Sequence, residues 1–431
     1  MSKYYTKTVI GIDVASEFSV ATILSPNGDI FRKSFKFYHS LSGFKNLMEE
    51  IKKAEKEFSM KPVIFMESTG IYHSNLFYFL IKNDYEAFII NPLVTNSNKN
   101  KDIRKVKNDK KDSLAIAKLA KYENIKAYSY FDVSIFSLKS LCRDYYKLVD
   151  IRTTFKLKLN SDLRISFPGY NNIFSDKTIA ASLALLKKYQ SPIDILKASK
   201  EDIIEILYNA SKRKPWCYKV YDKLLKYASE AVEIAIPSSA LSVRILNSIS
   251  MIESLNEQIK VLSDEIEILI NSDEISQNFK HNLKLTMSLG GIGLTSAATL
   301  LSEIGDFKNF KNPKQLVAYF GTDPSVNESG KFKGDKNKIS KRGSRIARRV
   351  LYTIALTAIR KKTNGEFCNK VLYDYYHMLI EKKKKKVAVI AIVNKIIKYI
   401  FAILRDQKEY EYRSPKLHFK MFLNNAGITA A

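Results

Sequence analysis

Hydrophobic and polar positions follow two different periods along the first 122 residues. Runs typical of strands give way to runs in which apolar residues recur every three or four positions, as in helices. The expected elements, in order, are "TVIGIDVA" (8–15), "FSVATILS" (18–25), "IFRKSFKF" (30–37), a helix at 42–58, "KPVIFMES" (61–68), a helix at 72–82, "EAFII" (86–90) and a basic helix ending near residue 122. This order predicts an α/β domain with a mixed sheet over residues 1–124.

The strand pattern disappears between residues 125 and 280, where leucine, isoleucine and lysine dominate. After Pro237, which marks a helix start, apolar residues recur at steps of three and four. They are Ile245, Ile252, Leu255, Ile259, Leu262, Ile266 and Leu269, with Ser248 at one core position. The pattern predicts an all-α region with a coiled-coil-like seam of roughly three to four heptads. Such a seam could pair with a second copy or pack inside one subunit.

The last part of the chain is expected to be mostly helical. A glycine turn leads into an alanine- and leucine-rich helix in "LTMSLGGIGLTSAATLLSEIG" (285–305), and "RIARRVLYTIALTAIR" (345–360) predicts another helix. The apolar stretch 387–404 is interrupted by Asn394, Lys395 and Lys398, which favours a packed helix over a membrane span. We therefore expect a mostly α domain at 281–370 and a basic helical tail at 371–431.

The formal net charge of +27 points to a polyanionic partner, and nucleic acid is the commonest one. Because lysine is spread along the whole chain, codon bias is the alternative explanation. The three cysteines are far apart and form no C-x-x-C, so neither a disulfide framework nor a zinc site is expected. With no signal-peptide pattern at the N-terminus, a cytoplasmic protein without a membrane partner is expected.

Four carboxylates of the first domain fall where a metal site would need them. Asp13 lies in the first strand, Glu67 ends a later strand, and Asp109 and Asp112 are three apart, so both can face one way on a helix. Mg²⁺ prefers oxygen ligands, and two ions roughly 3.5–4 Å apart can clamp a phosphodiester. Singly, each acid could cap a turn or sit on a solvated face. Asp13 is the hardest to explain this way, because a lone carboxylate in a buried strand is costly. Together the four indicate a ribonuclease-H-like nuclease core.

Four serines lie in "SVNESGKFKGDKNKISKRGS" (325–344). Ser344 precedes a helix and is interpreted as an N-cap, whereas Ser325 follows a proline and fits a turn. Ser340 could cap or contact phosphate. Ser329 precedes a glycine that allows close approach of a ligand, so it is favoured as a nucleophile activated by metal ions or nearby cations. Ser-Gly pairs are also common in ordinary turns.

Basic residues and glycines provide candidate nucleic-acid contacts. The "GGIG" turn resembles a helix-hairpin-helix, so Gly291 and Gly293 could offer backbone N–H groups to a phosphate; a turn without a ligand is the alternative. Side chains expected to hold phosphates are Lys331, Lys333, Lys336, Lys338, Lys341, Arg342, Arg345, Arg348 and Arg349. Such contacts position nucleic acid without reading its sequence, and a merely solvated basic face is the other interpretation.

In combination and order, these motifs resemble the DEDD transposases of insertion-sequence family 110, with its 1111 branch and the Piv invertases. The resemblance covers residues 1–122 and 281–360 and rests on "GIDVA", "FMESTGIY", "KNDKKDSLAIA", "LGGIGLTSAATLLSEIGD", "QLVAYFGTDP" and "NESGKF". It implies a RuvC-like N-terminal domain and a C-terminal transposase domain. It also implies that Asp13, Glu67, Asp109 and Asp112 bind metal and that Ser329 is catalytic. Asn108 and Ser113 depart from the Thr and Ala of the family pattern, and "GTDP" departs from its G-L-T-P.

By this resemblance the chain is expected to be a transposase that cuts and rejoins DNA through a serine–phosphate intermediate. It would use two Mg²⁺ ions and a guide (bridge) RNA, with double-stranded donor and target DNA as partners. A homodimer or tetramer is expected, in which the serine of one subunit meets the carboxylates of another. Two alternatives stay open. One is a RuvC-like Holliday-junction resolvase or metal-dependent nuclease that uses water, and the other is a non-catalytic basic nucleic-acid-binding protein.

Overall fold

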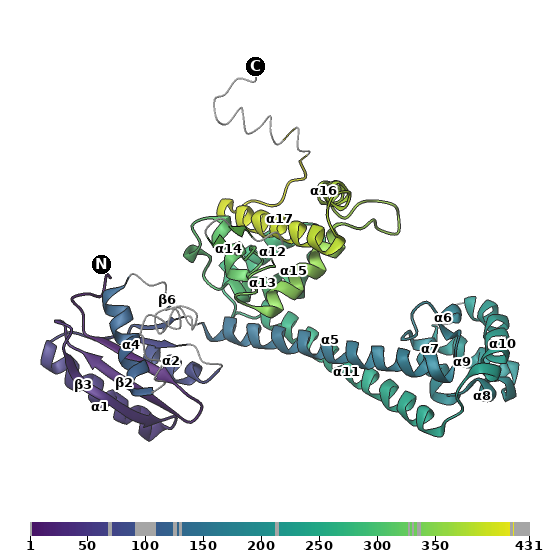
Figure 1. Cartoon of the computed structure of the whole chain (residues 1–431), viewed down its shortest axis with the longest axis horizontal. Coiled ribbons are helices and arrows are strands. Elements are labelled where there is room, and N and C mark those ends of the chain that lie inside the picture. Colours follow the sequence, from purple (N-terminus) through teal and green to yellow (C-terminus); the bar gives the residue numbers. More distant parts are fainter. Residues whose placement is uncertain are drawn as a thin grey trace, which may run out of the picture. The chain divides into compact units, whose positions relative to one another are not determined.

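The computed structural model describes residues 2–67, 71–90, 109–123, 127–128, 132–211, 215–325, 328–329, 332–333, 338–413 and 417. For residues 109–110, 127–128, 328–329 and 332–333 it describes the backbone and not the side chains. The chain divides into two compact units, Met1–Val133 and Ser134–Ala431, which are considered one at a time (Figure 1).

The first unit is built on a mixed sheet, as the alternating elements predict. Its strands are β1 (Val9–Val14), β2 (Phe18–Leu24), β3 (Ile30–Tyr38), β4 (Val63–Glu67), β5 (Ala87–Ile90) and β6 (Ala127–Tyr128), in the order β3-β2-β1-β4-β5-β6. β4 pairs in parallel with β1 and β5, and the other neighbours are antiparallel. This arrangement is compatible with a RuvC-like domain. The expectation that strands end before residue 125 is wrong for β6, because two residues are too few to produce a readable alternation.

Helices cover both faces of this sheet. α1 (Leu41–Phe58) and α2 (His73–Lys82) pack on the face that carries Ile10 and Met66, whereas α4 (Asp109–Tyr122) packs on the face that carries Val9 and Phe65. Burial on both sides explains why β1 before Asp13 and β4 before Glu67 are continuously apolar instead of alternating. The sheet therefore forms the centre of a three-layer domain, and the predicted α/β class is confirmed.

A buried lysine fastens the end of α4 to the loops beside β1. Lys121 is 1% exposed, and its Nζ donates to the carbonyl oxygens of Tyr5, Lys7 and Pro26 at 2.8, 2.9 and 3.0 Å. Burial lowers the pKa of this ammonium group. Three backbone acceptors thus depend on one side chain.

Replacing Lys121 with methionine should therefore destabilise the first unit. Methionine keeps the apolar stem but leaves three carbonyls without a donor, which is expected to lower the free energy of unfolding by about 2 kcal/mol or more. Thermal and urea unfolding measure the change. Lys118→Met, at an exposed position of the same helix, is the matched control and should change stability by less than about 0.5 kcal/mol. Equal effects of the two variants would contradict the role of Lys121.

The second unit is organised by two long antiparallel helices, α5 (Val133–Ser166) and α11 (Ser239–Asn271) (Figure 1). Arg244 Nη2 of α11 lies 2.6 Å from Asp162 Oδ1 of α5, and Arg152 Nη1 donates to Asn256 Oδ1 at 2.7 Å. The order of these pairs along the two helices fixes the antiparallel direction. The buried residues of α11 include Ile245, Ser248, Ile252, Leu255, Ile259 and Ile266. The predicted seam is thus buried inside one chain, so self-association needs another surface.

Short helices pack around one end of this pair. They are α6 (Tyr170–Ile173), α7 (Ala180–Lys188), α8 (Pro192–Lys197), α9 (Lys200–Ala210) and α10 (Trp216–Ile234). Tyr170 is buried at their centre with Phe167 and Leu224, and its hydroxyl lies 2.9 Å from Ser182 Oγ. This end has its own apolar core, distinct from the core at the other end of the pair.

The remaining helices form the C-terminal part of the second unit. They are α12 (Gln277–Met287), α13 (Leu294–Ile304), η1 (Phe307–Asn309), α14 (Pro313–Phe320), α15 (Arg345–Ala358), α16 (Lys370–Ile380) and α17 (Lys385–Asp406). Among the described residues, α17 alone is long and apolar enough to cross a membrane. It packs instead against α12, α14, α15 and α16, and Ile392, Ile396 and Ile397 are fully buried. The predicted packed helix is confirmed.

A buried carboxylate ties α13 to α5. Glu303 is 2% exposed and accepts hydrogen bonds from Arg143 Nε (2.6 Å) and Nη2 (3.0 Å), while Lys139 Nζ lies at 3.4 Å. Burial by itself raises the pKa of Glu303, but Arg143 and Lys139 outweigh it and lower the pKa. A depressed pKa means that this stabilisation is present above the carboxyl group's ordinary pKa and is lost as the pH falls through the folded-state value.

Glu303→Gln is accordingly expected to lower the free energy of unfolding near neutral pH by about 2 kcal/mol. The difference from wild type should shrink as the pH falls from about 6 to about 3, because the wild-type carboxyl then also becomes neutral. Urea unfolding at several pH values checks this, with the exposed Glu267→Gln of α11 as control. A difference that does not depend on pH would show that the charge of Glu303 is not what stabilises the contact.

Candidate active site

Two of the predicted carboxylates lie at neighbouring ends of parallel strands. Ile12 of β1 pairs with Met66 of β4, so Asp13 and Glu67 are the next residues in the same register. Side chains two positions apart point to the same face of a sheet, which puts both acids on the face of Val9 and Phe65, the face covered by α4. Glu67 is 8% exposed and Asp13 is partly exposed. The strands thus bring these two carboxylates to one edge.

The crossing point of α4 over β1 is set by a glycine. A Cβ at Gly11 would lie 2.3 Å from the carbonyl oxygen of Ser113 and 2.4 Å from the amide nitrogen of Ala117, so any side chain would displace the helix. From β2, Thr22 Oγ1 lies 2.8 Å from Ser113 Oγ at the same crossing. The sequence analysis predicted neither the close approach at Gly11 nor the contact between Thr22 and Ser113. The close approach could have been predicted, since a glycine inside a buried strand often marks a place where another backbone segment comes near.

The direction of α4 follows from its two anchored ends. Ser113 crosses β1 at Gly11, whereas Lys121, two turns later, binds carbonyls of the loop before β1. α4 therefore runs antiparallel to β1, and its first turn, with Asp109 and Asp112, lies toward the strand end that carries Asp13.

The donor chemistry at this edge fits a hard cation. The four predicted residues offer carboxylate oxygens, and these are the ligands that Mg²⁺ prefers. The side chain of Asp109 lies outside the described residues. Among the side chains that the structure does describe, no three His, Cys, Asp or Glu stand close enough to hold a metal ion together. The four-carboxylate site therefore stays a prediction, supported by the backbone positions of its members.

The segment 321–344, called the basic hairpin below, connects α14 to α15. Backbone hydrogen bonds join its two sides at the base, from the amide of Lys341 to the carbonyl of Gly321 (3.0 Å) and from Ser340 to Asp323 (2.8 Å). Farther out, β7 (Glu328–Ser329) pairs antiparallel with β8 (Phe332–Lys333). Ser329 pairs with Phe332, so the backbone of Ser329 lies beside the two-residue connection of the hairpin.

Three of the four candidate serines have structural partners. Ser344 Oγ accepts from the amide of Ala347 at 3.2 Å, which confirms it as the N-cap of α15. Ser340 Oγ donates to Asp323 Oδ1 at 2.5 Å, and Ser325 Oγ donates to the carbonyl of Lys338 at 2.8 Å. The side chain of Ser329 lies outside the described residues. The other three serines thus hold the base of the hairpin together.

Two glycines allow the base of the hairpin to close. Gly321 has φ +67° and Gly343 has φ +82°, a region that favours glycine. A Cβ at Gly321 would lie 1.9 Å from the carbonyl oxygen of Arg342, and one at Gly343 would lie 1.9 Å from that of Tyr319. The two backbone segments therefore cross in contact and fix where the hairpin leaves the helical core.

Four of the basic residues expected to hold phosphates are well placed to do so. Lys338, Lys341, Arg342 and Arg345 are exposed, and none forms an ion pair with another described residue. Lys331 and Lys336 lie outside the described residues, as does the side chain of Lys333. The exposed base of the hairpin thus offers a cluster of cations.

Two of the arginines expected to contact phosphate also have partners within the protein. Arg348 Nη1 donates to the carbonyls of Phe320, Arg342 and Gly343 at 3.0–3.1 Å. Arg349 Nε donates to Asp150 of α5 at 2.8 Å, and its guanidinium lies over the Tyr146 ring. Both arginines are partly exposed, and these contacts hold the hairpin and α15 in place.

In the glycine turn between α12 and α13, one glycine is required by the backbone conformation and another is exposed at the start of a helix. Gly291 has φ +99°, which only glycine adopts readily, so this residue is needed for the turn itself. Gly293 is exposed and is the N-cap of α13; no side chain caps this helix, and a Cβ at Gly293 would meet nothing within 4 Å. The backbone N–H groups at the start of α13 are thus not covered by a capping side chain.

Two family models match the chain. One, described as transposase, covers residues 10–168, and the other, described as transposase IS116/IS110/IS902 family, covers residues 283–373. The first spans all four carboxylates and the second spans the glycine turn and the basic hairpin. The first match also extends into α5, beyond the region in which the sequence motifs were found.

Curated relatives agree with these matches. An insertion element IS110 uncharacterized 43.6 kDa protein of Streptomyces coelicolor is 23% identical over 231 residues, 54% of this chain and 53% of that protein. The transposase for insertion sequence element IS1111A of Coxiella burnetii is 30% identical over 152 residues, 33% of this chain and 41% of that protein. The pilin gene-inverting protein of Moraxella bovis is 26% identical over 160 residues, 37% of this chain and 47% of that protein. The chain thus spans about half the length of the relatives, or less.

Proposed function

Because the chain belongs to the IS110 family of transposases, we propose that it cuts and rejoins DNA as the transposase of a mobile insertion sequence. The observation that carries the proposal is which candidate residues lie in each of the two matched segments. One holds the carboxylates at the carboxyl ends of β1 and β4, and the other holds the basic hairpin with Ser329.

In this proposal the hydroxyl of Ser329 is the nucleophile. Its oxygen bonds to phosphorus, the proton is lost, and a deoxyribose oxygen leaves as the DNA strand breaks. Attack by a deoxyribose hydroxyl on the serine–phosphate bond then releases Ser329 and joins the new strands. Two facts support Ser329: the hydroxyls of Ser325, Ser340 and Ser344 are engaged in the hairpin base, and Ser329 lies beside the hairpin connection.

Asp13, Glu67, Asp109 and Asp112 are proposed to hold Mg²⁺. When bound, Mg²⁺ neutralises negative charge that develops on the phosphodiester. The chain's contribution is to present the carboxylates from a rigid frame. β1 and β4 fix two of them in register, and Gly11 and Lys121 fix the helix that carries the others.

Double-stranded donor and target DNA and a structured guide RNA are the proposed partners. The exposed cations of the basic hairpin, the open N-terminus of α13 at Gly293 and the net charge of +27 support nucleic-acid binding. A homodimer or tetramer is also proposed, through a surface other than the α11 seam.

Salt dependence tests the nucleic-acid part of this proposal. Each phosphate contact that is lost should reduce the slope of log affinity against log salt for duplex DNA by roughly 0.9. The triple substitution Lys341→Gln, Arg342→Gln and Arg345→Gln should therefore flatten the slope by roughly 3. A matched triple on exposed positions of α10, Lys219→Gln, Lys223→Gln and Lys226→Gln, controls for the loss of charge alone. The same loss of slope in both triples would remove the hairpin from the DNA interface.

A further inference from the structure

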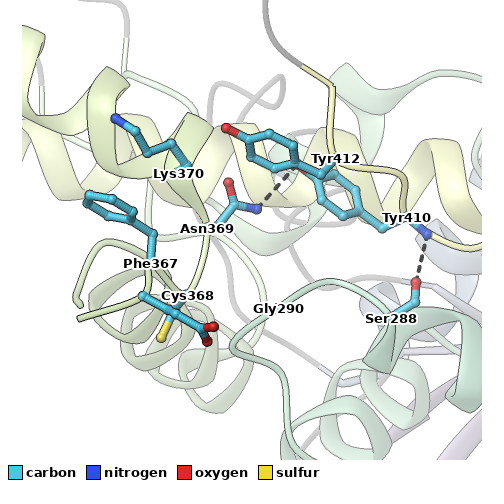
Figure 2. A pocket seen from close by; sticks show the side chains of 9 residues that line it. Ser288, Gly290, Phe367, Cys368, Asn369, Lys370, Tyr410 and Tyr412 are labelled. Atoms are coloured by element: carbon cyan, nitrogen blue, oxygen red, sulfur yellow. Dashed lines mark hydrogen bonds between the residues drawn. The ribbon is translucent and has the colours of Figure 1, made fainter. Parts of the chain in front are cut away.

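A pocket of about 570 Å³ lies next to the glycine turn in the C-terminal part of the second unit (Figure 2). Its walls come from three segments far apart in sequence. Ser288 and Gly290 belong to the turn after α12, residues 366–370 precede and begin α16, and Tyr410 and Tyr412 follow α17. This volume is in the usual range for small-ligand sites.

The pocket is built by specific contacts. The amide of Tyr410 donates to Ser288 Oγ at 2.7 Å, and Asn369 Nδ2 donates to the Tyr410 hydroxyl at 3.2 Å (Figure 2). Asn369 is 3% exposed, and its Oδ1 also accepts from the amide of Leu372, so this side chain braces the wall. A Cβ at Gly290 would lie 2.6 Å from the carbonyl oxygen of Cys368. Only glycine allows these two segments to meet.

Aromatic rings stand on opposite sides of this space. Tyr412 is 55% exposed, and Figure 2 shows it across the pocket from Phe367. Phe367 is held edge-on by the Tyr373 ring, with centroids 4.7 Å apart, and Lys361 Nζ lies 5.0 Å from its centroid. A planar aromatic ligand could stack on Tyr412 while its edge meets the polar groups of the wall.

The charges favour a ring with N–H donors over a free anion. Glu366 contributes a carboxylate whose pKa is lowered by Asn364 and Lys362, so it is ionised at neutral pH and can only accept hydrogen bonds. Lys370, the cation in the lining, is already paired with Asp374 at 2.5 Å. A phosphate inside the pocket would face the carboxylate of Glu366, which is already paired with Lys362 at 3.4 Å. The N–H edge of a nucleobase would instead find an acceptor.

We propose that this pocket binds an unpaired nucleobase of a nucleic-acid strand, stacked on Tyr412 with its N–H edge toward Glu366. The inference rests on the proposed function, which brings a strand to this unit. Gly290 is shared between the pocket and the glycine turn, so a strand whose phosphate lies on the N–H groups near Gly293 can place a neighbouring base in the pocket. The ligand is thus a single-stranded or extruded nucleotide of DNA or RNA.

A comparison of a homopolymer with an abasic strand separates the contribution of the bases to affinity from that of the charged backbone. Wild-type protein should bind single-stranded oligothymidylate or oligouridylate about tenfold or more tightly than an abasic strand of the same length, because stacking adds to the electrostatic term. Tyr412→Leu should reduce this ratio toward one, and Tyr412→Phe, which keeps the ring, should restore it. Affinity for the abasic strand should be unchanged in both variants. Comparison of the thymidine and uridine arms shows whether DNA or RNA is preferred.

Tyr218→Leu is the matched control, because Tyr218 on α10 is also 55% exposed. A wild-type protein that binds base-containing and abasic strands equally overturns the pocket, while salt-dependent binding of duplex DNA would leave the proposed function intact. If Tyr412→Leu loses the same affinity for the base-containing strand and for the abasic strand, the proposed pocket is also overturned, since the substitution would then act by disturbing the fold. If no nucleic acid binds, the proposed function and the pocket fail together.

Discussion

Replacing Ser329 with alanine is expected to abolish cleavage of DNA and therefore recombination. Removal of a nucleophile that forms a covalent intermediate typically costs about 10³-fold or more in rate. Folding and DNA affinity should stay near wild type, because the base of the hairpin is held by Ser325, Ser340, Ser344 and Arg348. A nicking assay on supercoiled DNA carrying the element's ends measures the loss.

The neighbouring serines provide the controls. Ser340→Ala removes a hydrogen bond to Asp323, and Ser344→Ala removes the N-cap of α15, which costs about 1 kcal/mol of stability. Both variants should keep cleavage within about tenfold of wild type, since neither residue is the proposed nucleophile. Cleavage that survives in Ser329→Ala would favour the alternative in which water attacks, as in a metal-dependent resolvase or nuclease.

The second large effect is expected at Asp13. Asp13→Asn keeps the size of the side chain and its place in β1 but replaces an anionic oxygen with an amide, which should weaken the proposed binding of Mg²⁺. Cleavage should fall by about 10²-fold or more, and the affinity for DNA should not, because the proposed DNA contacts are made by basic residues of the other unit. The measurement is the nicking rate at several Mg²⁺ concentrations, beside the dissociation constant for the same DNA.

Asp29→Asn serves as the control for Asp13→Asn. Asp29 is an exposed acid in the turn between β2 and β3. Its replacement changes the net charge by the same amount and leaves the carboxyl ends of β1 and β4 untouched. Its nicking rate should match wild type. If Asp13→Asn also matches wild type with Mg²⁺ present, the carboxylates are not a metal site. If Ser329→Ala matches as well, the alternative of a non-catalytic nucleic-acid-binding protein is favoured.

The elements that sequence predicted best are those whose pattern is local. β1 and β4 stand out because both faces are buried, and Ser344 is recognisable as a cap because its partner, Ala347, is three residues away. The seam of α11 was also visible, but periodicity cannot name its partner. That partner, α5, lies about a hundred residues earlier, and its buried positions include the polar residues Asp162 and Ser166.

The same distinction applies to the candidate site. The register of Asp13 and Glu67 could be anticipated from the order of strands and helices. The roles of Arg348 and Arg349 could not, because their partners lie on α5 or in the backbone of the hairpin base, and basic residues near a loop look alike in sequence. The contact between Thr22 and Ser113 joins residues 91 positions apart. Ser113, which departs from the family pattern, thus has a hydrogen-bonding partner in the fold.

Identification of the residue that carries DNA during the reaction tests the central claim most directly. Wild-type protein is incubated with Mg²⁺ and a nicked suicide substrate that prevents religation, digested with protease, and the nucleotide-bearing peptide is sequenced by mass spectrometry. The account predicts one adduct, on Ser329, which is absent from Ser329→Ala and reduced in Asp13→Asn. An adduct on Ser325, Ser340, Ser344 or a tyrosine, or efficient cleavage with no adduct at all, would contradict it.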